Sequence, residues 1–215
     1  MKQMHIVSVN LGRAETIQHG NRSFTTGITK HAVSQSEFVT VAGLENDTIC
    51  DNEHHGGDDQ AVYAYSANDY EWWSEKLARD IVPGTFGENL TIAGLPHDMK
   101  AGDRLLIGDL ILEATMPRIP CSTLAAAMQD SGFGLQFRYA ERPGFYFRVL
   151  NEGRVSTGDS VTMVENPNES ITMLELFRLS YEITPDVKIL NRVLEAPIAE
   201  RMRAKFESKI ALPQA

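Results

Sequence analysis

Short runs of alternating hydrophobic and polar residues, separated by glycine-containing turns, fill the first two thirds of the chain. Such runs, bounded by Gly-Asp and Asn-x-Gly turns, are typical of β-strands. The expected strands are His5–Asn10, Ile28–Val33, Phe38–Ala42, Ala61–Tyr65, Leu90–Ala93, Arg104–Ile107, Leu110–Ala114, Gly144–Leu150 and Ser160–Val164. Many short strands at even spacing predict a mainly β fold that closes, or nearly closes, into a barrel, rather than parallel βαβ units.

One helical segment interrupts this pattern. Ser66 is the expected N-cap of a helix over Ala67–Arg79, in which Tyr70, Trp73 and Leu77 share one stripe. We interpret this aromatic stripe as packing against the core.

The pattern changes after Asn166-Pro167-Asn168, where strand signals give way to helical ones. Pro185 and Pro197 suit first-turn positions, and Arg178 marks the solvent edge of an otherwise apolar stripe. The expected helices are Met173–Tyr181, Pro185–Leu194 and Pro197–Ile210. The chain thus divides into a β-barrel domain over residues 1–166, with peripheral helices, and a small three-helix appendage over 167–215. Because so few helical residues cannot bury a substantial hydrophobic core by themselves, we expect the appendage to dock on the barrel or on a second subunit of a homodimer.

Composition narrows the class of protein. The 215 residues are 42% hydrophobic and 23% charged, as in soluble proteins with a substantial core, and no apolar run approaches a membrane span. The net charge of −9 argues against nucleic-acid binding, because a phosphate backbone needs a basic surface. The two cysteines are too few for a disulfide framework, which favours a cytoplasmic protein.

The strongest chemical signal is Pro117-Arg118-Ile119-Pro120-Cys121-Ser122, which runs into a helical segment. The pattern predicts Cys121 in the first helical turn, with Ser122 or Thr123 as the cap. The helix dipole and the nearby Arg118 would lower the thiol pKa from its usual value of about 8.5 and so favour a thiolate. Such a sulfur is a nucleophile or a metal ligand; the alternative is a small buried residue at a helix start.

A second cluster runs from Cys50 to Gln60 and contains His54, His55 and several carboxylates. Imidazole and carboxylate groups suit a divalent metal and metal-assisted hydrolysis. However, adjacent histidines point in different directions, and a solvated acidic loop is the alternative. The chain has no phosphate-binding loop or dinucleotide fingerprint, so we expect no pyridine nucleotide site.

Two weaker motifs complete the set. Val82–Leu90 is a glycine-shaped loop that carries Glu88 and Asn89, and Thr25–Lys30 combines hydroxyls, a glycine and a lysine that could meet an anion.

In their order along the chain, these motifs resemble the MOSC family, named for the C-terminal domain of molybdenum cofactor sulfurases. The motifs are Thr26-Gly27-Ile28-x-Lys30, Gly43-Leu44-Glu45-Asn46-Asp47 with His55-Gly56-Gly57-x-x-x-Ala61-Val62, Phe86-Gly87-Glu88-Asn89-Leu90, and Pro117-Arg118-x-Pro120-Cys121. The resemblance runs from about Val7 to Val164 and is closest to the stand-alone bacterial YiiM-like branch, whose three-helix tail the C-terminal segment also resembles. Asp58 and Gln60 depart from the proline and basic residue common in relatives.

The resemblance implies a barrel-like fold and a molybdenum cofactor (molybdopterin) whose metal is ligated by Cys121. It also implies reduction of N-hydroxylated compounds, such as hydroxylaminopurine base analogues, with electrons from a separate reductase. Catalytic roles then fall to Cys121 and His55. The cofactor-binding residues it implies are Thr26, Lys30, His55, Asn89, Arg118 and Cys121. Lys30 and Arg118 are the first candidates to neutralise the cofactor phosphate, and the further candidates are Arg13, Arg138 and Arg148.

Two other functions stay open at the level of sequence. In the first, the protein is a carrier that holds cofactor or activated sulfur, with Cys121 as a persulfide site. In the second, it is a hydrolase that uses a divalent metal at His54, His55 and the neighbouring aspartates.

Overall fold

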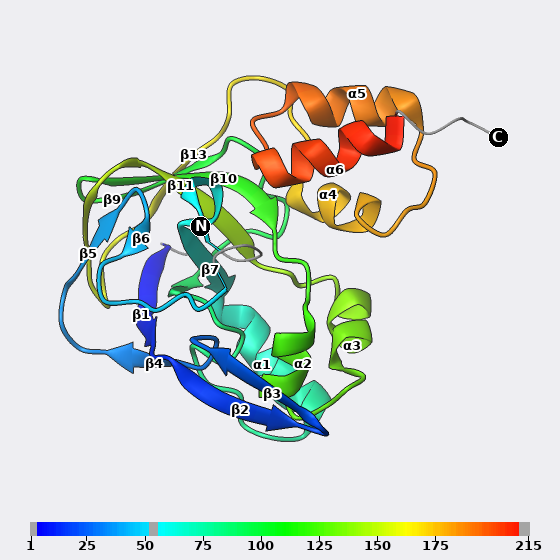
Figure 1. The fold of residues 1–215 in the computed structure, drawn as a ribbon. Helices are drawn as coiled ribbons and strands as arrows, with labels where there is room; N and C mark the ends of the chain where they lie inside the picture. The colour runs from blue at the N-terminus through cyan, green and yellow to red at the C-terminus, as the bar shows by residue number, and fades with distance from the viewer. Residues whose placement is uncertain (1–3, 52–55, 211–215) are drawn as a thin grey trace.

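A computed structural model describes residues 4–51 and 56–210. Its centre is a mixed eight-stranded sheet in the order β13-β9-β10-β11-β7-β8-β1-β4 (Figure 1). The strands of this sheet are β1 (His5–Gly12), β4 (Lys30–Val33), β7 (Val62–Ser66), β8 (Leu90–Ala93), β9 (Arg104–Ile107), β10 (Leu110–Pro117), β11 (Phe145–Asn151) and β13 (Thr162–Val164). All of them overlap strands expected from the sequence, so the mainly β prediction is confirmed.

The expectation of a barrel is not confirmed, because the sheet is open. Strands β4 and β13 lie at its two edges, and no ladder joins them within the described part of the chain. Strands β7 and β8 pair in parallel, with helix α1 (Ala67–Leu77) between them in the chain. A parallel neighbour requires a crossover connection, which α1 provides, so the chain does contain one βαβ unit.

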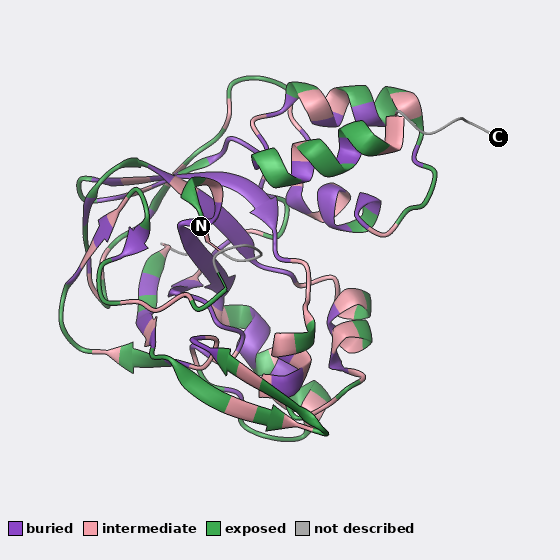
Figure 2. Ribbon diagram, viewed as in Figure 1, coloured by how far each residue is buried: buried purple, intermediate pink, exposed green. Residues whose placement is uncertain are grey.

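Smaller strand groups lie outside the main sheet. Strands β5 (Glu37–Thr40), β6 (Gly43–Leu44) and β12 (Gly153–Val155) form a three-stranded sheet, and β2 (Glu15–His19) and β3 (Arg22–Thr26) form a hairpin. The hairpin is largely exposed, whereas the strands of the main sheet are largely buried (Figure 2).

Helix α1 packs in an aromatic cluster with α2 (Ser122–Ala127) and α3 (Phe133–Ala140) nearby (Figure 1). The ring of Trp73 lies 5.3 Å from Phe133 and 5.5 Å from Phe86, centroid to centroid. The predicted aromatic stripe is therefore core. The predicted cap is only partly right: Ser66 occupies the N-cap position of α1, but its buried hydroxyl has no hydrogen-bond partner among the described residues.

Three further helices, α4 (Met173–Leu179), α5 (Val187–Glu195) and α6 (Glu200–Ile210), lie together beside one end of the sheet (Figure 1). The main-chain N–H of Met173 donates to Met99 and that of Ala199 to Thr115, both within 3.1 Å. Pro185 was expected in the first turn of its helix, but it lies one residue before the N-cap Asp186, so this prediction is wrong. The Asp186 carboxylate accepts from the Lys188 N–H, which is a cap that a proline side chain cannot form. Among the described residues, no helix is both long and apolar enough to cross a membrane.

Candidate functional site

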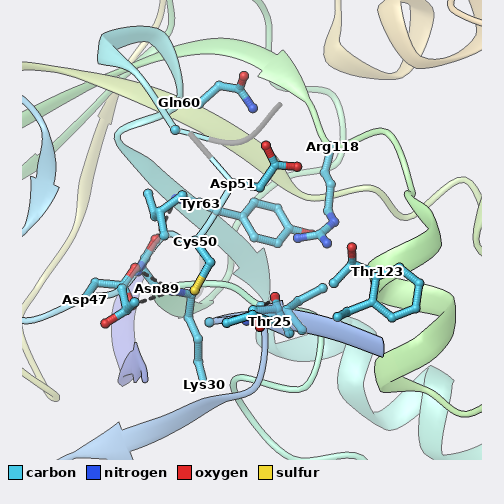
Figure 3. Close-up of a pocket in the computed structure, with 18 of the residues that line it drawn as sticks. Thr25, Lys30, Asp47, Cys50, Asp51, Gln60, Tyr63, Asn89, Arg118 and Thr123 are labelled. Atoms are coloured by element: carbon cyan, nitrogen blue, oxygen red, sulfur yellow. Dashed lines mark hydrogen bonds and ion pairs between the residues drawn. The ribbon is translucent and has the colours of Figure 1, made fainter. Parts of the chain in front are cut away.

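A cavity of about 230 Å³ lies between the β3–β4 turn, the segment 47–51 and the end of β10 (Figure 3). It brings together four predicted site residues that come from three separate motifs: Thr26, Lys30, Asn89 and Arg118. The sequence motifs therefore converge on one place in the fold. We call this space the first cavity.

Asp47 organises one wall of the first cavity. Its carboxylate forms a buried ion pair with Lys30 and accepts from Asn89 Nδ2 at 2.8 Å and from the Gly12 N–H at 2.7 Å. The Tyr63 N–H donates to Asn89 Oδ1 at 3.2 Å, which fixes the amide. Burial lowers the pKa of Lys30, and the neighbouring Asp47 opposes that shift. The charge of Lys30 is thus already matched within the protein.

Arg118 forms the opposite wall and is only 4% exposed. Its guanidinium carbon lies 5.0 Å from the centroid of the Tyr63 ring, and its buried Nε has no hydrogen-bond partner among the described residues. Burial acts to lower the pKa of Arg118, but Tyr146, Tyr63 and the Cys121 thiol raise it more, so the net shift is upward. Arg118 is therefore a buried, permanently charged donor with unused hydrogen-bonding capacity.

Glycines let main chain form part of the wall. A Cβ atom on Gly27 would lie 2.0 Å from the carbonyl oxygen of Thr48, and Gly87 has a φ of +77°. Only glycine tolerates both conditions easily. Next to Gly27, the Thr26 hydroxyl accepts from the Ile28 N–H at 3.1 Å, which holds the turn before β4 in place.

Cys121 is the N-cap residue of α2, so the sequence prediction that Ser122 or Thr123 would cap this helix is wrong. The backbone of Cys121 is extended (φ −120°, ψ 171°), as is usual for an N-cap residue, and the helix starts at Ser122. Helix α2 has six residues, so its dipole contributes less to stabilising a thiolate than the sequence suggested.

Cys121 lines a second cavity of about 610 Å³ and not the first. The two cavities adjoin: their shared wall is made by Asp51, Gln60, Thr123 and Tyr146. Burial raises the pKa of Tyr146, so its hydroxyl stays protonated at neutral pH. The thiol therefore lies beside, rather than inside, the space that holds Lys30 and Arg118.

The other three predicted arginines are not in the first cavity. Arg148 pairs with Asp59 at 2.7 Å, Arg138 lies 4.1 Å above the Tyr181 ring, and Arg13 lines a separate surface cavity. His54 and His55 lie outside the described residues. Across the residues that the structure does describe, no three His, Cys, Asp or Glu side chains are placed to hold a metal ion.

Sequence reasoning assigned no role to Asp47, Cys50, Tyr63 or Tyr146, all of which line the first cavity. The Cys50 side chain points into the cavity between the Asn89 and Tyr63 walls (Figure 3). Asp47 belongs to the motif Gly43-Leu44-Glu45-Asn46-Asp47, and its place in that motif was the signal that could have assigned it to the site. Nothing in the sequence separates Tyr63 or Tyr146 from other strand aromatics.

Comparison with known proteins gives consistent matches. The MOSC domain model matches residues 51–162. The uncharacterized protein YflK of Bacillus subtilis is 33% identical over 95% of this chain and 93% of its own length. Protein YiiM of Escherichia coli is 26% identical over 88% of this chain and 85% of its own. A protein named "Reductase" from Gibberella moniliformis is 25% identical over 91% of this chain, which spans 35% of that protein.

The fold is shared as well. The crystal structure of YiiM from Geobacillus stearothermophilus has a TM-score of 0.81 at 28% identity and covers 96% of this chain and 99% of its own. The predicted resemblance is confirmed by the domain match, the YflK relationship and the common fold. This chain belongs to the MOSC domain family and is similar to YflK and YiiM over most of its length.

Proposed function

We propose that this protein binds the molybdenum cofactor and reduces N-hydroxylated compounds, with Cys121 as the ligand of the metal. MOSC domains are associated with this cofactor, and one relative is named a reductase. The observation that carries the proposal is that Cys121 lines a cavity that adjoins the one lined by Arg118, while Arg118 keeps a buried donor without a partner among the described residues. A soft sulfur next to an unsatisfied cation suits a metal cofactor that bears a phosphate.

The residues of the first cavity fit that group. Arg118 Nε would donate to the phosphate, because a buried donor without a partner is costly and an anionic oxygen satisfies it. Gly27 and Gly87 let the main chain of this wall pack closely against Thr48 and Ile28, which fixes the shape of the cavity. Asn89 is held by Asp47 and Tyr63 and would position the pterin. Lys30 acts through Asp47, since its own charge is paired.

The reaction consumes two electrons and two protons: R–NHOH + 2 e⁻ + 2 H⁺ gives R–NH₂ + H₂O. The bound cofactor supplies the two-electron chemistry, and a separate reductase supplies the electrons. The protein holds the substrate beside Cys121 and provides protons. Tyr146 lines both cavities and stays protonated, so it can donate a hydrogen bond to the substrate without giving up its proton. His55, which lies outside the described residues, remains the predicted proton donor.

The test is cofactor retention in two matched cysteine variants. Wild type, Cys121→Ser and Cys50→Ser are produced in a host that makes the cofactor, and molybdenum and pterin are measured per chain. We expect Cys121→Ser to lose at least tenfold in molybdenum content. Cys50→Ser is the control, because Cys50 also lines the first cavity but lies on the wall away from Arg118.

Turnover of an N-hydroxylated compound with a chemical reductant completes the test. Loss of turnover in Cys121→Ser, with retention in Cys50→Ser, supports the reductase. Full molybdenum content and full activity in Cys121→Ser would reject the assignment. Labile sulfur on Cys121 without turnover would favour the carrier instead.

A further inference from the structure

The second cavity is larger than the first, and helix α6 forms one of its walls. The thiol of Cys121 and the phenol of Tyr146 lie on the sheet side, with Met116 and Ile119 as apolar neighbours. Arg201 and Lys205 enter from α6. A volume of about 610 Å³ falls in the usual range of small-molecule sites.

The cations gather at one end of this cavity. Arg201 and Lys205 are four residues apart on α6 and therefore project from the same helix face. Burial is the main cause that lowers the pKa of Lys205, and the positive charges of Lys209 and Arg201 add to this effect. Asp51 also lines this cavity, and Arg201 lies 3.5 Å from the side-chain oxygen of Gln60 in the wall shared with the first cavity. The Lys205 ammonium donates one of its three N–H groups to the Ser180 carbonyl at 3.0 Å. The two cations together favour an anionic group at the α6 wall.

Helix α6 is fixed to the site rather than loosely placed. Asp59, in the short 3₁₀ helix η1 (Asp58–Gln60), accepts from the Glu200 N–H at 2.7 Å through Oδ2 and pairs with Arg148 at 2.7 Å through Oδ1. Thr115 of β10 donates to the Asp59 carbonyl at 2.6 Å, and its own carbonyl accepts from the Ala199 N–H at 3.1 Å. The cationic face of α6 therefore has a defined position opposite Cys121.

These features describe a site for a molecule with an apolar ring and an anionic end. The apolar wall and Tyr146 suit a heteroaromatic ring near the thiol, and Arg201 and Lys205 suit a phosphate. We propose that the second cavity holds the phosphate of an N-hydroxylated nucleotide against Arg201 and Lys205, so that the nucleotide is preferred over the free base or nucleoside. The reaction in this inference rests on the proposed function, whereas the preference for a nucleotide rests on the α6 wall.

Binding of the reduced products tests the preference without turnover. Adenosine 5′-monophosphate and adenosine are titrated by calorimetry into the full wild-type chain, the double variant Arg201→Met/Lys205→Met, and Lys188→Met. Lys188→Met is the control for loss of a cation elsewhere, because Lys188 lies on α5 outside both cavities. We expect wild type and Lys188→Met to bind the nucleotide at least tenfold more tightly than the nucleoside. In the double variant the ratio should fall below threefold, with nucleoside affinity unchanged.

Kinetics on cofactor-loaded protein separate this inference from the proposed function. Equal kcat/KM for N⁶-hydroxyadenosine and its 5′-monophosphate in wild type would overturn the preference and leave the reductase intact. Turnover of neither compound, with nucleotide binding still dependent on Arg201 and Lys205, would reject the reductase and retain the anion site. Inorganic phosphate that binds as tightly as the nucleotide would overturn the nucleotide assignment.

Discussion

Asp47 is the residue on which the geometry of the first cavity depends. It joins the end of β1 at Gly12, the start of β4 at Lys30 and the loop before β8 at Asn89. The side chains of Lys30 and Asp47 are 7% and 6% exposed, so neither charge can be satisfied by water if its partner is lost. The pair therefore acts as a unit.

We predict that Asp47→Asn destabilises the fold by about 3–5 kcal/mol, because it leaves the charge of Lys30 buried without a counter-ion. The double variant Lys30→Met/Asp47→Asn should recover a substantial part of that loss. Urea unfolding of the wild type, both single variants and the double variant measures the coupling. Additive effects of the two substitutions would contradict the buried pair.

Glu88 is the second informative residue, since it is fully buried behind the first cavity. Burial raises the pKa of Glu88 above its ordinary value of 4.5, although hydrogen bonds from Tyr70, Gly84 and Thr91 oppose this effect. Between the unfolded and the folded pKa, the folded state therefore holds a proton that the unfolded chain has lost. The stability contributed by this group is complete below about pH 4.5 and falls as pH rises through the folded pKa, by up to about 1.4 kcal/mol for each pH unit in that interval.

Glu88→Gln should remove this dependence, so the wild type should lose stability relative to the variant as pH rises from about 4 to 8. Denaturant unfolding across that range measures the difference. Glu141→Gln provides a comparison of opposite sign: Arg178 lowers the pKa of Glu141, so that carboxylate stabilises above about pH 4.5 and the effect is lost on acidification. Because the pair is exposed, its contribution is below about 1 kcal/mol. Parallel curves for Glu88→Gln and wild type would contradict the raised pKa.

At the scale of elements, the buried strands of the main sheet could be predicted from the sequence. Elements that do not show one clear hydrophobic face could not. Strands β8 and β9 have the predicted boundaries, because turns bound each apolar run. Helix α3 was missed: Phe133 and Phe137 are buried at helical spacing, but Gly134 lowers the propensity and the exposed Leu135 blurs the stripe. The β2–β3 hairpin was missed because its largely exposed strands carry no buried alternation.

The docking of α6 depends on one carboxylate that comes from outside the helix. Asp59 of η1 accepts from the first N–H of α6, as an N-cap residue would. We predict that Asp59→Ala costs about 0.5–2 kcal/mol, as loss of an N-cap does, and accelerates amide exchange at the start of α6. Hydrogen exchange resolved by segment measures this. Asp58→Ala is the matched control, since Asp58 is exposed on the same turn; equal protection of α6 in both variants would rule out the role of Asp59.

At the scale of the whole molecule, the site is built from segments that are distant in sequence. Most residues of the segments 24–30, 47–51 and 118–123 line the cavities, together with Gly87, Asn89, Tyr146 and, for the second cavity, α6. The sequence motifs predicted four of the residues that line the first cavity, because each motif carries its own local chemistry, but gave no role to Asp47, Cys50, Tyr63 or Tyr146. They could not predict that Cys121 faces a different cavity, or that α6 supplies cations, because both follow from long-range packing.

The predicted domain boundary at residue 166 can be tested by measuring whether the two parts of the chain unfold together. Ile171, Met173 and Phe206 of the appendage belong to the same buried cluster as Leu112 of β10. We therefore expect residues 1–166 and 167–215 to unfold in one transition, since separating them exposes a shared apolar core. A chain that ends at Asn166 should bind a hydrophobic dye and lose cooperative melting. Two resolved calorimetric transitions in the full chain would instead indicate independent domains.

Helix α6 comes after every strand in the chain, yet it completes the cavity beside Cys121. During synthesis on the ribosome, the sheet residues emerge first, and the thiol then faces solvent on the side that α6 later covers. The cationic wall of this cavity therefore forms last. A nascent chain from which α6 has not yet emerged has the thiol side of the cavity but lacks Arg201 and Lys205.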